Sequence, residues 1–482
     1  STGGIAIDCT NEICEENKQF CIRAAKIIGL DICGIDITAP SIRESIKDNG
    51  VIMEVNAAPG IRMHHYPSSG QSVDDGKAIL NHLYNGKPKN IPVISITGTN
   101  GKTTTTRLIS YVLKLMGNTV GMTSTEGIYI GDECIDIGDD TGYDSAKAVL
   151  LNKDIDVAVF ETARGGMIKK GLAYDLADVG VITNITEDHL GLDEVCTMED
   201  LSFVKSLIIE AVKPNGYSVI NADDNWSRKL IDRAKGEIIY FSKDKDNPLI
   251  QKNIQEGKKA VFIDGDMLCV INNNKKYNVL KIDDIPLTLN GKLLFNIENS
   301  LAACAALVGL GIDYCMIARG FNKFKLDNRH NAGRFNIYEV DGRTIVLDYG
   351  HNLEGYRAIF QALNNIEHNN LIGVIGIPGD RSDSMAIDIG KISEEYLDFI
   401  IIKEDIDKRG REAGKIADLI KSGIKNKEKC KVLLEECKAF EEAIKVSSKG
   451  DIIIVFFEEL EPLINVIENY KNHNTDERIA SL

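Results

Sequence analysis

The pattern of hydrophobic and polar positions alternates between short apolar runs and longer amphipathic stretches. Apolar runs recur at 156–160, 179–185, 217–221 and 237–241, and segments with helical periodicity lie between them. Continuous apolar runs of this length predict strands that are buried on both faces of a sheet. We therefore expect residues 91–325 to form a parallel sheet with helices on both faces, the organisation of an α/β protein.

The stretch from Ile91 to Ile109 carries the clearest chemical signal in the chain. Its sequence, IPVISITGTNGKTTTTRLI, predicts a strand, a sharp glycine turn and then a helix over 102–115. Backbone N–H groups at the start of such a helix point toward an anion, and the helix dipole favours negative charge there. The pattern predicts a phosphate-binding loop in which Lys102 neutralises the terminal phosphates of a nucleotide and the Thr103 hydroxyl ligates Mg²⁺.

Residues 1–90 predict one helix followed by two strands, and the second strand ends in polar residues. Glu54 and Asn56 lie two residues apart on this strand and therefore project to the same face. Together with Asp36 on the neighbouring strand they form an oxygen-rich cluster that suits Mg²⁺.

Polar side chains also follow two central strands, at the edge where open α/β sheets place their ligands. Glu161 comes directly after the run at 156–160, and a carboxylate at this place in a nucleotide-binding protein is a candidate Mg²⁺ ligand. His189 follows the run at 179–185 in the stretch NITEDHLG. A lone histidine after a strand fits either a metal ligand or a structural role.

Composition limits the classes of function. The chain has 482 residues, enough for about three domains, and 43% of them are hydrophobic. Its net charge is −16 without a basic stripe, which argues against a general nucleic-acid or membrane-surface role. No apolar run reaches the length of a membrane-spanning helix. The eleven cysteines are scattered and contain no Cys-x-x-Cys, so we interpret them as reduced thiols of a cytoplasmic protein.

The glycine loop departs from the general phosphate-loop pattern, because Ile96 occupies the position of its first glycine. The shorter form G-T-N-G-K-T-T resembles the loop of the Mur ligase family. The stretches EVNAAPGIRMHHYPSSG, TSTEGIYIGD, ETARGG and KED…RGRE together resemble the cyanophycin synthetase family over nearly the whole chain. This resemblance implies the C-terminal part of an ATP-grasp domain at 1–90, a Mur ligase-type central domain at 91–325 and a Rossmann-like C-terminal domain at 326–482.

The resemblance also implies roles for single residues, with ATP and Mg²⁺ as the cofactors. The residues implied in ATP binding are Gly98, Thr99, Asn100, Gly101, Lys102, Thr103, Thr104, Asn299 and Arg334. The implied catalytic set is Lys102, Glu161, His189, Lys205, Arg334, Asp348 and His351. Metal binding would fall to Thr103, Glu161, His189 and a carbamylated Lys205, and in the ATP-grasp segment to Asp36, Glu54 and Asn56. The implied substrate-binding residues are Arg164, Asp380, Arg381 and Asp383.

For two of these residues, an ordinary structural role is an alternative to the implied function. Lys205 lies in a helical stretch, where an ordinary surface lysine is common, and His351 fits a turn with a hydrogen-bonded histidine. The match is also incomplete at two positions. Ala332 replaces the proline of the family's P-G-R segment, and Leu353 replaces the proline that usually follows Asn352.

In cyanophycin synthetases the Mur-like half adds arginine to aspartate side chains. The resemblance therefore implies a ligase that activates a carboxylate as an acyl phosphate, with ATP, arginine and a poly-aspartate or cyanophycin primer as partners and a homo-oligomer as the expected assembly. A murein or folate-type ligase and a non-catalytic nucleotide-binding subunit stay as alternatives. The lysines that cover ATP in an ATP-grasp fold would lie before residue 1, so we expect the metal cluster of residues 1–90 to be inactive by itself.

Overall fold

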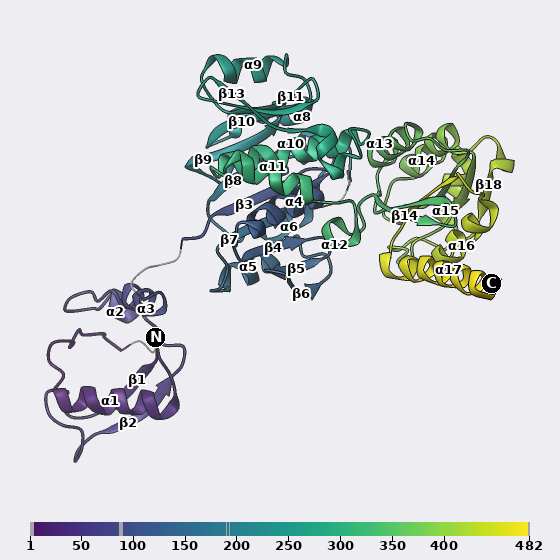
Figure 1. The fold of residues 1–482 in the computed structure, drawn as a ribbon. Helices are drawn as coiled ribbons and strands as arrows, with labels where there is room; N and C mark the ends of the chain where they lie inside the picture. The colour runs from purple at the N-terminus through teal and green to yellow at the C-terminus, as the bar shows by residue number, and fades with distance from the viewer. Residues whose placement is uncertain (1–3, 86–89, 189, 192, 481–482) are drawn as a thin grey trace. The chain divides into compact units, whose positions relative to one another are not determined.

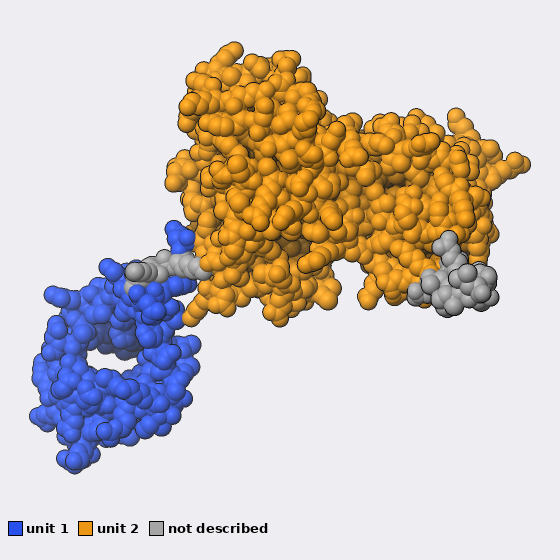
Figure 2. Space-filling model, in the orientation of Figure 1, with its two compact units in different colours: residues 1–90 blue, residues 91–482 orange. Residues whose placement is uncertain are grey.

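The chain folds into two compact units. The computed structural model describes residues 4–85, 90–188, 190–191 and 193–480. Unit 1 comprises residues 1–90 and unit 2 comprises residues 91–482 (Figure 2). None of the described helices pairs the length with the hydropathy that crossing a bilayer requires. All eleven cysteines are free thiols, as predicted.

Unit 1 contains a two-stranded antiparallel sheet and three helices. Its elements are α1 (Glu15–Ile28), β1 (Gly34–Thr38), β2 (Val51–Asn56), α2 (Arg62–His65) and α3 (Asp75–Leu83). Among its described residues only Asn17 and Ile46 have buried side chains. The Asn17 amide bonds to the backbone of Glu44 and Ile46, and so ties α1 to the segment before β2. Unit 1 therefore buries little apolar surface by itself, and the space-filling view shows a hole through it (Figure 2).

Unit 2 is built on two sheets (Figure 1). The large sheet has eleven strands in the order β13-β12-β11-β10-β9-β8-β3-β7-β4-β5-β6. These strands are β3 (Val93–Thr97), β4 (Val120–Ser124), β5 (Gly127–Ile130), β6 (Glu133–Ile137), β7 (Val157–Glu161), β8 (Ala177–Ile182), β9 (Val212–Asn221), β10 (Glu237–Ser242), β11 (Ala260–Asp264), β12 (Met267–Asn272) and β13 (Lys275–Lys281). Its helices are α4 (Lys102–Leu115), α5 (Tyr143–Leu151), α6 (Arg164–Lys170), α7 (Met198–Glu210), α8 (Asn225–Arg228), α9 (Pro248–Gln255), α10 (Leu294–Gly309) and α11 (Tyr314–Lys323).

The predicted parallel sheet is correct for the seven strands from β11 to β4 and wrong for the edges. All neighbours within that stretch pair in parallel, whereas β12 and β13 at one edge and β5 and β6 at the other pair antiparallel. The edge strands are joined by tight turns such as Asn273-Asn274, both with positive φ. Two-residue turns of this kind connect antiparallel strands directly, and no helix is needed between them.

The small sheet has six strands in the order β14-β15-β19-β16-β17-β18. Its strands are β14 (Asn336–Val340), β15 (Arg343–Asp348), β16 (Leu371–Ile375), β17 (Phe399–Ile402), β18 (Cys430–Val432) and β19 (Ile452–Phe456). The helices that accompany it are α12 (Asn328–Asn331), α13 (Leu353–Asn364), α14 (Asp383–Tyr396), α15 (Lys415–Gly423), α16 (Glu436–Val446) and α17 (Leu460–Ala480). Separate apolar clusters cover its two faces, so it is an α/β layer of the Rossmann-like kind that was predicted.

Helix α4 is central to the large sheet because it is buried along most of its length. It begins at Lys102 directly after Gly101, as predicted, and packs with α10 and α11 on one face of the sheet. The alanines of α10 let the two helix backbones approach closely, which keeps the start of α4 at a defined place beside the end of β3.

We expect Gly180→Ala to destabilise unit 2, since α7 packs directly against β8 at this position. A Cβ at residue 180 would lie 2.3 Å from the Ile208 carbonyl oxygen, and a backbone atom cannot move aside without shifting the helix. The expected loss in the free energy of unfolding is about 1–3 kcal/mol, measured by urea titration. Gly142→Ala is the matched control, since its backbone is extended and a Cβ there meets nothing within 4 Å. Equal stability of the two variants would contradict the close packing of α7.

Candidate active site

The glycine loop between β3 and α4 is packed tightly against two distant parts of the chain. Gly98 and Gly101 have φ values of +155° and +84°. A Cβ at Gly98 would lie 1.9 Å from the Thr183 hydroxyl, and one at Gly101 would lie 2.0 Å from the Asn299 amide oxygen. The loop therefore requires glycine for its conformation and for the space around it. The contact also places Asn299 beside the phosphate loop, and its role in ATP binding stays a prediction.

One cleft of unit 2 collects most of the predicted residues. Its lining includes Thr99, Asn100, Gly101, Lys102, Thr103, Thr104, Glu161, Asn299, Arg334, Asp348 and His351. These residues come from both sheets, so segments more than two hundred positions apart in the sequence meet around the start of α4. Lys102 lies within this lining, and its ammonium donates to the Thr99 carbonyl over 3.0 Å.

Glu161 lies at the end of β7 and faces the start of α4. Its carboxylate accepts from the Thr103 hydroxyl over 3.1 Å and from the Thr125 N–H over 3.2 Å. Burial raises the pKa of this carboxyl, and the nearby positive charges of Lys102 and Arg334 oppose the rise. A hydroxyl and a carboxylate in contact beside a phosphate-binding loop are oxygen donors of the kind that Mg²⁺ takes, so the residues present fit the predicted ion.

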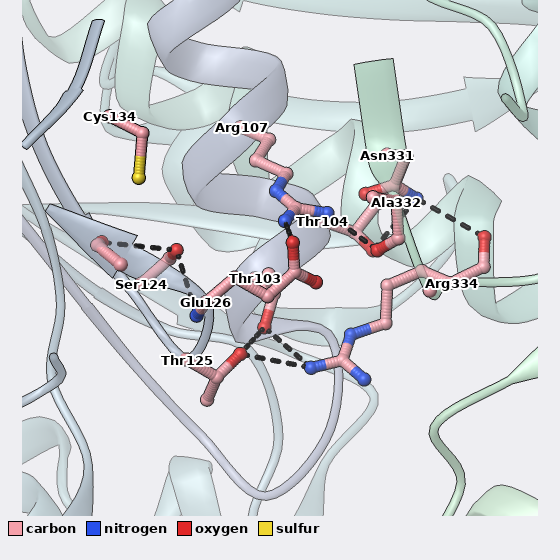
Figure 3. A network of polar contacts seen from close by, with 12 residues as sticks. Thr103, Thr104, Arg107, Ser124, Thr125, Glu126, Cys134, Asn331, Ala332 and Arg334 are labelled. Atoms are coloured by element: carbon pink, nitrogen blue, oxygen red, sulfur yellow. Dashed lines mark hydrogen bonds and ion pairs between the residues drawn. The ribbon is translucent and has the colours of Figure 1, made fainter. Parts of the chain in front are cut away.

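Arg334, just before β14 of the small sheet, also reaches the start of α4. Its guanidinium donates to the Thr103 hydroxyl over 3.2 Å and to the Thr125 hydroxyl over 3.0 Å (Figure 3). The guanidinium also lies 4.7 Å from the centre of the Tyr349 ring. Arg334 thus lies where it can contact an anion bound at the start of α4, although Ala332 replaces the proline of the family's motif.

Lys205 is buried, so the alternative of a surface lysine is wrong. It lies on α7, whose first turn is held by a reciprocal capping box between Thr197 and Asp200. The Lys205 ammonium donates to the Gly98 carbonyl over 2.6 Å. Burial, with a smaller effect from the positive charge of Lys102, lowers the pKa of Lys205 to about 7. A large fraction of this amine is therefore neutral near physiological pH.

The loop after β15 places two predicted residues in the cleft. Asp348 accepts from the Phe335 N–H over 2.8 Å, and burial raises its pKa to about 6. The His351 ring lies 3.8 Å from the Asp188 carboxylate, a contact between the two sheets. His351 therefore has an ionic neighbour from the other sheet, as well as a place in the cleft lining.

The predicted substrate-binding residues form ion pairs outside the lining of this cleft. Arg381 pairs with Asp380 over 2.9 Å and lies 3.9 Å from Asp188. Asp383 pairs with Arg411 over 2.6 Å. Arg164, at the start of α6, pairs with Asp193 over 2.9 Å. The roles of Arg164, Asp380, Arg381 and Asp383 stay predictions.

Two residues at the site were given no role from the sequence. One is Asn352, the N-cap of α13, which exchanges two amide hydrogen bonds with the predicted residue Asn100, over 2.9 and 3.3 Å. Thr125 contacts both Glu161 and Arg334. Thr125 lies in the stretch TSTEGIYIGD, which carried a family resemblance but no assigned chemistry.

The predicted cluster of unit 1 is assembled by its two strands. Asp36 and Glu54 are opposite each other in the register of β1 and β2, and the Asn56 amide lies 3.4 Å and 3.2 Å from their carboxylates. Their metal role stays a prediction. In the described parts of the chain, no group of three His, Cys, Asp or Glu side chains is placed to hold a metal ion. His189 lies outside the described residues.

Family models match three consecutive parts of the chain. A Mur ligase middle domain matches residues 96–307, and a Mur ligase glutamate ligase domain matches residues 333–456. A RimK-like ATP-grasp domain matches residues 3–75. The chain belongs to the Mur ligase family and carries an ATP-grasp segment before its Mur ligase domains.

Similarity to individual proteins narrows the relationship within the Mur ligases. The chain is a homologue of the cyanophycin synthetases, which confirms the resemblance drawn from its motifs. It is 42% identical to the cyanophycin synthetase of Synechocystis sp. over 98% of its length, and 42% identical to that of Geminocystis herdmanii over the same share. It spans about half of these relatives, 54% of each.

Solved structures confirm the fold at low sequence identity. A pseudomurein peptide ligase type C from Methanothermus fervidus aligns with a TM-score of 0.58 at 22% identity, covering 86% of this chain and 89% of that one. MurF ligase from Thermotoga maritima, in complex with ADP, aligns with a TM-score of 0.56 at 19% identity, covering 84% and 85%. These similarities support the Mur ligase fold.

The buried carboxyl of Asp348 predicts a pH-dependent stability. Its pKa of about 6 lies above the usual value of 3.8, so the folded state holds the proton more tightly than the unfolded chain does. This contribution to stability is largest at acid pH and falls as the pH rises through about 6. Relative to Asp348→Asn, the wild-type free energy of unfolding should fall by about 1.4 kcal/mol between pH 5 and pH 7.5 in urea titrations. If the free energy of unfolding changed with pH in the same way for wild type and Asp348→Asn, the result would contradict this prediction.

Proposed function

We propose that this chain is an ATP-dependent ligase that joins arginine to an aspartate side-chain carboxylate through an acyl phosphate. The observation that carries the proposal is the meeting of Arg334 and Thr103 at the start of α4, 3.2 Å apart, in a cleft lined by residues of both sheets. The homology to cyanophycin synthetases supports the choice of arginine and of a poly-aspartate or cyanophycin primer as substrates.

The chemistry takes place in two steps. In the first, an oxygen of the substrate carboxylate attacks the γ-phosphorus of ATP, and the bond to the leaving ADP breaks. In the second, the neutral amine of arginine attacks the acyl carbon, phosphate leaves with the shared oxygen, and the amine loses a proton. The protein has little covalent work in such steps, so positioning and charge stabilisation provide the catalysis.

The residues of the cleft fit these two tasks. Lys102 and the N–H groups at the start of α4 would bind the phosphates, and Arg334 would stabilise the charge that develops during transfer. Asp348 and His351 would line the side from which the amine approaches. Mg²⁺ would neutralise phosphate charge when bound, held by Thr103, Glu161, His189 and a carbamylated Lys205.

Oxygen-18 in the aspartate carboxylates of the primer tests the proposal. An acyl phosphate route transfers one labelled oxygen to the released phosphate, and the release should require arginine. Lys102→Ala should abolish this release in a folded protein, since the loop then lacks its terminal-phosphate charge. Unlabelled phosphate would show simple ATP hydrolysis. Labelled phosphate that depends on another amino acid would favour a different Mur-type specificity, and ATP binding without turnover would favour a nucleotide-binding subunit.

Arg334→Ala should lower kcat more than it weakens ATP binding. The phosphate loop lies on the large sheet and Arg334 lies beside the small one, so ATP can bind before the arginine contact is complete. The expected loss in kcat is roughly 10²–10³-fold, as for other preorganised charge donors, with a small change in Kd for ATP. Calorimetry and arginine-dependent phosphate release measure the two quantities, with exposed Arg319→Ala as the control. Loss of ATP binding with an unchanged kcat would place Arg334 in ground-state binding instead.

Carbamylation of Lys205 is a further prediction of this proposal. The neutral amine would attack CO₂, form an N–C bond and lose a proton, which turns a buried cation site into an anion beside the phosphate loop. Protein equilibrated with ¹³C-bicarbonate should give a carbamate signal by ¹³C NMR that Lys205→Ala lacks. Lys213→Ala, which removes a lysine ion-paired with Asp178, should keep the signal. A signal that survives in Lys205→Ala would refute the assignment.

A further inference from the structure

The segment 331–336, between α12 and β14, carries Arg334 and needs support from its surroundings. Gly333 and Phe335 on either side of Arg334 have φ values of +68° and +53°. Phenylalanine in this region is strained by about 1–3 kcal/mol and keeps the conformation only where neighbours hold it. One such neighbour is Asp348 of the small sheet, which accepts the Phe335 N–H.

Helix α4 of the large sheet holds the same segment from the other side (Figure 3). Arg107 lies one turn beyond Thr103 on one face of the helix. Its guanidinium donates to the Ala332 carbonyl over 2.8 Å and forms an ion pair with Glu126. The Arg107 side chain is 8% exposed, and the residue is absent from the lining of the cleft. Arg107 therefore contacts the backbone two residues before Arg334 without reaching the cleft itself.

A second tie comes from the same helix. The Asn331 amide donates to the Thr104 hydroxyl over 3.3 Å. A hydrogen bond between two neutral groups is weaker than one from a guanidinium. The arginine contact is therefore the stronger of these two ties between α4 and the segment.

We propose that Arg107 is a positioning residue that holds Arg334 at the nucleotide phosphates, with Glu126 as the partner that orients its guanidinium. The inference rests on the proposed function. The guanidinium of arginine is planar and has several N–H donors, so it can donate to the Glu126 carboxylate and the Ala332 carbonyl at the same time. A lysine ammonium lacks this fixed geometry. Glu126 also offsets the charge of Arg107, which would otherwise lie buried without an opposite charge.

Arg107→Met should therefore lower kcat while ATP binding is kept. Misplacement of a charge donor by about 1 Å lowers rates by roughly 10²-fold, so we expect a loss of about 10- to 100-fold in arginine-dependent phosphate release. The Kd for ATP should stay within about threefold, since the phosphate loop is unchanged. Arg107→Lys should recover only part of the rate. Lys114→Met, on the same helix in an exposed pair with Asp132, is the control and should behave as wild type.

A double-mutant cycle separates positioning from general stability. If Arg107 acts through Arg334, then Arg107→Met should have little further effect in the Arg334→Ala background. The proposal would be overturned if the loss in kcat of the double variant equalled the product of the two single losses. A normal kcat in Arg107→Met would overturn it as well. Glu126→Gln, which keeps the shape of the side chain, gives the same test where Arg107→Met fails to fold.

Hydrogen exchange measures the positioning without any turnover. Peptides that cover 331–336 should exchange faster in Arg107→Met than in wild type or Lys114→Met, because the segment loses its anchor on α4. Unchanged exchange there would refute the positioning role even if the rate falls. Faster exchange in a chain that shows no arginine-dependent release would support the positioning role while the proposed function fails.

Discussion

The tight packing of the loop after β3 is the constraint on which the rest of unit 2 depends. Gly98 and Gly101 lie so close to Thr183 and Asn299 that a Cβ at either glycine would overlap a side-chain oxygen. The end of β3, the end of β8 and the start of α10 are therefore held around one turn of backbone. Because α4 begins at that turn, its free N–H groups and its dipole keep a defined direction.

Three ionisable groups around this turn, Glu161, Asp348 and Lys205, are buried, and burial shifts each of them toward its neutral form. It raises the pKa of Glu161 and Asp348 and lowers that of Lys205. Opposite charges nearby limit the effect, as Lys102 and Arg334 do for Glu161. Ligands of opposite charge would return these groups to their ionised forms, which couples nucleotide binding to the protonation of the cleft.

The two units differ in how completely they are packed. Unit 2 has apolar clusters on both faces of each sheet, whereas unit 1 has two buried side chains among its described residues and several exposed large apolar ones, such as Ile27, Met53 and Tyr66. Side chains that take part in a reaction must be held to within a fraction of an ångström, and this requires packed surroundings. The dense packing around the cleft of unit 2 meets that requirement, and the exposed cluster of Asp36, Glu54 and Asn56 has much less of it.

Local signals along the chain were sufficient to predict the fold class and the strand, turn and helix of the glycine loop, and the family resemblance pointed to most of the cleft residues. The strand at 91–97, the turn and the helix from Lys102 are set by short-range preferences, and Glu161 and Arg334 lie in short motifs that can be read without long-range information. The antiparallel edges of the large sheet were missed, because the hairpins at 119–137 and 260–281 carry weak periodicity.

Only the tertiary structure showed that Lys205 is buried against the Gly98 carbonyl, that Asn100 pairs with Asn352, and that Arg107 anchors the segment with Arg334. These contacts join residues about one hundred to more than two hundred and fifty positions apart. Their physical cause is that burial and pairing of polar groups depend on which surfaces the packed sheets and helices bring together, and the residues themselves do not encode that locally.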